Sequence, residues 1–261
     1  MDAVVLRDVR FQPDVEGLKK KLRVRDGGGW ADRFTRLVQE AEAIARPGAL
    51  YGVAYVDSIG DSSVVIDGIR FDSRVLQVNL EKVHRVFPFL ATCGSELHEW
   101  AAAQDDVLQR YHADEIAETA LRQALSVLRE HLNKRYRLGR TSTMSPGSLP
   151  DWPIQAQRPL FTLLGDTEQL LDVRLTDSLL MVPSKSVSGI CFPTEQTFAN
   201  CQLCLREGCP SRQAPYEAGL YDKRYRSLPG MASPEGYPHV WARGGSAAMQ
   251  EAREQEDVVG C

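Results

Sequence analysis

The chain has 261 residues, long enough to bury a substantial hydrophobic core as one large domain or two smaller ones. Its hydrophobic fraction of 43% and charged fraction of 25% are ordinary for a globular protein. The net charge of −4 gives no support to nucleic-acid binding or to binding of anionic membranes.

The N-terminal residues lack the basic and apolar regions of a signal peptide. No window approaches the roughly 18 apolar residues that a membrane helix needs. We therefore expect a cytoplasmic protein without a membrane partner. In that reducing compartment, clustered thiols more often bind metal or carry out redox chemistry than form disulfides.

The first part of the chain predicts a mixture of strands and helices. The segments with strand patterns are residues 4–11, 49–59, 62–71 and 85–94. The segments with helical periodicity are residues 14–22, 31–46 and 71–80. A long helical region then covers residues 97–135, and we expect a break near Ala113 because Asp114 can cap a second helix.

The second part begins with a loop or linker rich in Ser, Thr, Pro and Gly. Two short helices are expected at residues 154–165 and 166–173, and residues 174–192 predict a loop between extended segments. Residues 245–261 suggest a frayed helix or tail. Because strands and helices do not alternate regularly, the predicted class is α+β, with a mixed or antiparallel sheet and long helices.

Four of the six cysteines are clustered late in the chain, and they are Cys191, Cys201, Cys204 and Cys209. Their spacing favours a four-thiolate iron–sulfur cluster, with [4Fe–4S] as the preferred type, because Cys209 is followed by proline as in ferredoxin runs. Tetrahedral zinc has the same ligand count, although zinc ribbons usually show two CxxC pairs. Free or disulfide-bonded thiols are the third interpretation.

Two further stretches resemble the activation domain of cobalamin-dependent methionine synthase. Residues 140–164 contain an arginine, a Pro-Gly loop and a helix in the order found in that family. A second, more specific pattern is matched by Leu175, Thr176, Ser178, Met181, Pro183, Ser186, Val187, Ser188 and Gly189. Residues 89–100 and 111–125 are similar to stand-alone members of the family, so the resemblance spans about residues 80–192.

The resemblance implies four regions in the chain. They are an N-terminal α+β portion (1–80), a core resembling the activation domain (81–192), a cysteine motif (191–212) and a C-terminal extension (213–261). It also implies a function: reductive reactivation of a corrinoid protein or cobalamin-dependent methyltransferase, which supplies the cobalamin. Electrons would pass from an external low-potential donor through the iron–sulfur cluster to Co(II), with S-adenosylmethionine as methyl donor.

By the same resemblance, Arg140 is the partner of the S-adenosylmethionine carboxylate, with Arg137 as a competitor. The turn of Pro146, Gly147 and Ser148 is expected to contact the ligand through its backbone. Hydroxyls of Ser186 and Ser188, followed by Gly189, are expected to face the ligand or the corrin.

The family continues its Pro-Gly loop with tyrosine, whereas this chain has Ser148 and Leu149. This difference leaves an alternative open. In that alternative the chain is a non-enzymatic, zinc-stapled adaptor or chaperone that binds a corrinoid methyltransferase without a methyl-donor site.

Overall fold

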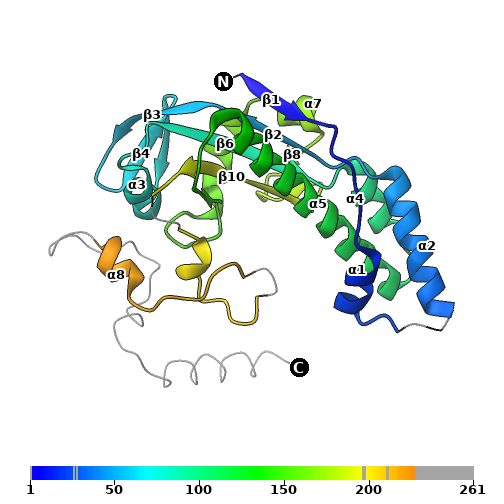
Figure 1. The fold of residues 1–261 in the computed structure, drawn as a ribbon. Coiled ribbons are helices and arrows are strands. Elements are labelled where there is room, and N and C mark those ends of the chain that lie inside the picture. Colours follow the sequence, from blue (N-terminus) through cyan, green and yellow to red (C-terminus); the bar gives the residue numbers. More distant parts are fainter. Residues whose placement is uncertain (1, 26, 28, 196–197, 210–211, 227–261) are drawn as a thin grey trace.

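The computed structural model describes residues 2–25, 27, 29–195, 198–209 and 212–226. Within these residues, one eight-stranded antiparallel sheet carries helices on both faces (Figure 1). This architecture confirms the predicted α+β class with an antiparallel sheet and long helices. The predicted tail helix at residues 245–261 lies outside the described residues.

β6 is the centre of the sheet. The strands of the sheet are β1 (Ala3–Leu6), β2 (Gly48–Gly52), β3 (Ala54–Ile59), β4 (Ser63–Ile66), β5 (Ile69–Asp72), β6 (Arg85–Thr92), β7 (Thr141–Met144) and β10 (Ser186–Pro193). β2 and β3 pair with one edge of β6, and β10 pairs with β6 and with β7. Strands from both sides of the predicted boundary at residue 80 therefore belong to one sheet.

A separate two-stranded sheet is formed by β8 (Arg174–Leu175) and β9 (Met181–Val182). Leu175 and Met181 of the family-like pattern lie in its strands, and Thr176 and Ser178 lie between them. In the turn between its strands, the Thr176 hydroxyl forms a hydrogen bond of 3.0 Å with Ser178 Oγ and accepts a hydrogen bond from the Leu180 amide. The polar residues of this part of the pattern therefore stabilise a hairpin.

The helices up to α7 match the predicted segments except at one break, whereas η2 and α8 were not predicted. They are α1 (Val15–Leu22), α2 (Gly29–Ile44), α3 (Arg74–Leu80), α4 (Ser95–Ala102), α5 (Val107–Tyr136), α6 (Gln157–Leu164), α7 (Thr167–Leu171) and α8 (Leu220–Arg224), with 3₁₀ turns η1 (Ile154–Ala156) and η2 (Asn200–Gln202). The predicted break near Ala113 is wrong, because α5 runs through that position. The chain breaks at residues 103–106 instead, where the Asp106 carboxylate accepts the Gln109 amide at 2.8 Å.

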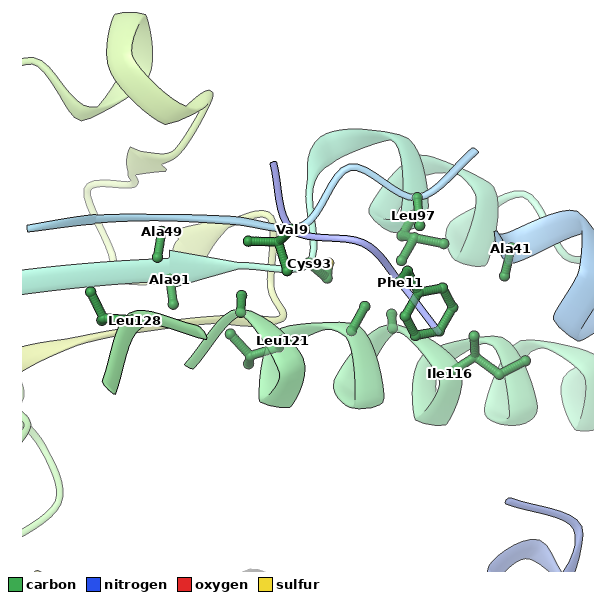
Figure 2. Close-up of a cluster of buried hydrophobic side chains, with 14 of the residues drawn as sticks. Val9, Phe11, Ala41, Ala49, Ala91, Cys93, Leu97, Ile116, Leu121 and Leu128 are labelled. Atoms are coloured by element: carbon green, nitrogen blue, oxygen red, sulfur yellow. The ribbon is translucent and has the colours of Figure 1, made fainter. Parts of the chain in front are cut away.

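Alternation along the central strands creates two cores. Phe87, Phe89 and Ala91 of β6 join a cluster under α5 and α2, where Figure 2 shows Ala91 facing Leu121 and Leu128 of α5. Leu90 faces the opposite side, in a second cluster with α3, α6 and Trp152. Each core is closed by helices whose apolar residues recur at three- and four-residue spacing.

No helix within the described ranges is long and apolar enough to cross a membrane. The cytoplasmic location stays a prediction.

Candidate functional site

The Pro–Gly turn (residues 145–148) follows β7 directly and is closed by its own hydrogen bonds. The Gly147 amide donates to the Trp152 carbonyl at 2.8 Å, and the Ser148 amide donates to Ser145 O at 3.2 Å. Gly147 has a positive φ of 78°, and a Cβ there would lie 2.9 Å from Ile154 Cδ1. Glycine is therefore required for the shape of the turn, and its amide is already occupied.

The turn contacts the cysteine loop, which we define as residues 198–209 and 212–214. Asn200 Nδ2 donates to Ser148 Oγ at 2.7 Å. At the same edge of the sheet, the Phe198 amide donates to Ser142 Oγ at 2.8 Å, and Ala199 forms a parallel bridge with Thr143. The predicted ligand turn and the predicted thiol site are thus neighbours in the structure.

Arg140 lies at the opposite end of β7 from the Pro–Gly turn. Its side chain is exposed, and its carbonyl accepts the Thr194 amide at 3.0 Å. Because a strand rises about 3.3 Å per residue, the four residues of β7 hold the guanidinium away from Pro146. Arg137, the competing arginine, ends α5 with φ 51°.

Ser186, Ser188 and Gly189 all lie on β10, but they have different surroundings. The Ser186 hydroxyl donates to the Pro183 carbonyl at 2.7 Å and lies 2.9 Å from Thr92 Oγ1. Ser188 is 2% exposed, and its hydroxyl has no hydrogen-bond partner among the described residues. A Cβ on Gly189 would lie 2.4 Å from Met144 O, so glycine lets β7 approach.

Two unpartnered polar atoms belong to residues that contact the Pro–Gly turn, and they are Trp152 Nε1 and Asn200 Oδ1. The other buried side-chain atoms without a partner in the described part of the chain are Gln157 Oε1, Ser188 Oγ and His112 Nδ1. Leaving such a group unsatisfied costs about 1–3 kcal/mol, so a molecule that bonds them would be favoured here. Of these residues, the sequence patterns singled out Ser188 alone.

Cys191 lies in β10, in the core under α5. It is 3% exposed, and it pairs with Phe87 of β6 and Thr143 of β7. Burial raises the pKa of its thiol to about 11, so the group is protonated at neutral pH, whereas a metal ligand must be a thiolate. Cys93 is buried in the same core, and burial raises the pKa of its thiol to about 12.

Cys201, Cys204 and Cys209 are partly exposed in the cysteine loop. Phe198 and Leu203 anchor this loop in the core on the face of the sheet opposite to α5. No three His, Cys, Asp or Glu side chains within the described ranges lie close enough to hold a metal ion. The structure therefore does not assemble the predicted four-thiol site.

Neither a protein-family model nor a curated protein matches this sequence. A solved structure does match: a crystal structure of the MetH reactivation domain bound to AdoHcy, with a TM-score of 0.50 and 16% sequence identity. The match covers 77% of this chain and 82% of that chain. The chain has the reactivation-domain fold. This confirms the predicted resemblance at the level of the fold, while the roles of the site residues stay predictions.

Proposed function

We propose that this chain supports reductive reactivation of a corrinoid protein and binds a ligand of the S-adenosylmethionine class beside the Pro–Gly turn. The proposal depends chiefly on the fold that the chain shares with a reactivation domain bound to AdoHcy. It also draws on the turn itself, because Ser145 and Gly189 of the family-like patterns meet there.

The buried unpartnered atoms support a ligand with both hydrogen-bond donors and acceptors. Ser188 Oγ can accept or donate a hydrogen bond, Trp152 Nε1 can donate one, and Gln157 Oε1 can accept one. A nucleoside with amino and hydroxyl groups would satisfy such a mixed set. Arg140 can bind the carboxylate of the same molecule only if the ligand extends along β7, because the strand separates Arg140 from the turn.

Bound at this site, S-adenosylmethionine supplies an electrophilic methyl group, whose irreversible transfer to cobalt favours the preceding one-electron reduction. The corrinoid partner brings the cobalamin, and this chain binds and orients the methyl donor. We further propose that thiols of the cysteine loop hold an iron–sulfur centre that an external low-potential donor reduces, with zinc as the alternative metal. Asn200 supports this arrangement because it joins that loop to the Pro–Gly turn.

Calorimetry with AdoHcy and S-adenosylmethionine tests the ligand site. The wild-type chain should give a saturable heat, and Ser188→Ala should weaken binding about tenfold through the loss of one buried hydrogen bond. Arg140→Ala should weaken it further if the carboxylate reaches that end of β7, and Arg137→Ala should bind normally if Arg140, and not its competitor Arg137, is the partner of the carboxylate. Absence of heat with both ligands would reject the proposed site.

The adaptor alternative is favoured by one observation. The Pro–Gly turn already uses the Gly147 amide and the Ser148 hydroxyl for contacts within the chain. A chain that binds zinc, forms a complex with a corrinoid methyltransferase and gives no heat with either ligand would be an adaptor.

A further inference from the structure

A cavity of about 570 Å³ lies where the end of α1 and the starts of α2 and α5 come together (Figure 1). Residues 22–25 after α1 form one wall, Trp30 of α2 forms a second, and Leu108 and His112 of α5 form a third. Leu108 and His112 are four residues apart, so they lie on one face of the helix. Sites for small molecules have volumes of roughly 300–1,000 Å³, and this cavity falls within that range.

His112 brings a buried polar group to the cavity wall. Its side chain is 2% exposed, and its Nδ1 has no hydrogen-bond partner among the described residues. The rings of Trp30 and Phe34 pack against the imidazole with centroid distances of 5.4 and 5.3 Å, so its orientation is fixed. Buried polar atoms are normally paired, so a bound molecule that pairs with Nδ1 would be favoured here.

The imidazole of His112 contributes a hydrogen bond and not a charge. Burial lowers its pKa, and the nearby carboxylates of Asp106 and Glu115 oppose this effect only in part. The ring is therefore neutral at pH 7, and a neutral imidazole can donate one hydrogen bond and accept another. Any charge that attracts a ligand must come from other residues.

Two arginines supply that charge. Arg23 and Arg25 line the cavity, and within the residues that the structure describes neither is in an ion pair. The backbone that carries them is fixed by the turn that ends α1. The Arg23 amide donates to the Lys20 carbonyl at 3.3 Å, with φ 55° at Arg23. The Val24 amide donates to the Lys19 carbonyl at 2.9 Å.

The carboxylates near His112 are already occupied. Glu115 forms an ion pair of 2.7 Å with Lys21, which ties α1 to α5. Asp106 caps α5 by accepting the Gln109 amide. No Asp or Glu of the described ranges lines the cavity, so its charged lining is positive.

We propose that this cavity binds a small aromatic anion. Its flat ring lies against Trp30 and Leu108, its carboxylate or phosphate group meets Arg23 and Arg25, and a ring heteroatom forms a hydrogen bond with His112. An indole ring and a half-exposed leucine give the apolar contact, and guanidinium groups bind both kinds of acidic group through paired hydrogen bonds. This inference goes beyond the proposed function and does not depend on it.

Titration of the full chain with indole-3-acetate tests the inference, followed by NMR of ¹⁵N-labelled histidine rings. The ring resonance that His112→Phe removes identifies His112, and it should shift on saturation with a dissociation constant below about 1 mM. Indole-3-acetamide has the same ring without the charge and should bind at least about tenfold more weakly. With 3-indoxyl phosphate as the second anion, binding of either supports the inference, and the tighter one identifies the acidic group.

Variants separate the two parts of the site. Arg23→Gln and Arg25→Gln should each weaken binding of the anion at least threefold and leave binding of the amide unchanged. Lys20→Gln is the matched control, because it removes one exposed charge from α1 outside the cavity, and it should bind normally. His112→Phe keeps an aromatic ring between Trp30 and Phe34, so it should weaken both indoles about fivefold without a loss of stability in urea.

Four results would overturn the inference. They are no binding of either anion, equal binding of indole-3-acetate and its amide, an unmoved His112 resonance at saturation, and arginine variants that bind like Lys20→Gln. If His112→Phe fails to fold, the comparison of the arginine variants with Lys20→Gln still decides the outcome.

Discussion

Gly189→Ala tests whether the glycine of the family-like pattern is there for packing. The new methyl group would lie 2.4 Å from Met144 O, 2.8 Å from Ser145 Oγ and 3.1 Å from a Phe89 ring carbon. Ordinary contacts begin near 3.4 Å, so the end of β7 must move by about 1 Å. Such overpacking costs about 1–3 kcal/mol, and a weakened β7–β10 hydrogen bond adds about 1 kcal/mol.

We therefore expect Gly189→Ala to lower the free energy of unfolding by about 2–4 kcal/mol, measured by urea unfolding and circular dichroism. Gly29→Ala is the matched control, because nothing lies within 4 Å of its new methyl group, and its stability should not fall. A Gly189→Ala chain as stable as the wild type, with weakened AdoHcy binding, would show that this reasoning is wrong and that the glycine serves the ligand.

Three other changes test the fold. Asp106→Ala should lower the free energy of unfolding by about 1 kcal/mol because it removes the α5 cap. Asp114 is half-exposed and lies 3.9 Å from Lys185, so Asp114→Ala should cost under about 0.5 kcal/mol. Equal losses of stability in urea would contradict the observed break. Asp151→Ala leaves two buried donors at the start of α3 unpaired, so unfolding in urea should show a loss of about 2–3 kcal/mol, and a loss under 1 kcal/mol would count against that contact. Burial raises the pKa of Cys191 to about 11 from an ordinary value near 9, so on raising the pH the unfolded chain releases this proton before the folded chain does. The free energy of unfolding should therefore be unaffected by this thiol below about pH 8 and should fall by about 2–3 kcal/mol from pH 9 to 11. Urea unfolding across this range should show a smaller decline for Cys191→Ala, and an identical decline would refute the assignment.

Local patterns predicted most helices and strands because each buries a regular stripe of apolar residues. α2 is an example, since Phe34, Leu37, Val38 and Ala41 all face the core. Asp114, as a possible helix cap, misplaced the break in the long helical region. α4 and α5 both pack against one core, so apolar periodicity continues across the gap, and only the cap at Asp106 marks it.

The arrangement of the sheet has no such local signal. β10 pairs with β6, about 100 residues earlier in the chain, and brings Gly189 against the end of β7. The Pro–Gly turn and the cysteine loop are some 50 residues apart in the sequence, yet a hydrogen bond from Asn200 to Ser148 joins them directly. Sequence motifs thus identified the pieces of the candidate site, and pairing between distant strands decides which pieces meet.

The cysteine cluster shows where spacing alone misleads. Cys191 is only ten residues from Cys201, but it lies within a strand in which Ile190 and Phe192 face one core and Cys191 faces the other. Alternation along β10 was visible in the sequence, and it already assigns Cys191 to the face opposite its two apolar neighbours. Spacing of ten residues therefore does not bring Cys191 to the cysteine loop, because Phe198 and Leu203 hold that loop in the core on the opposite face of the sheet.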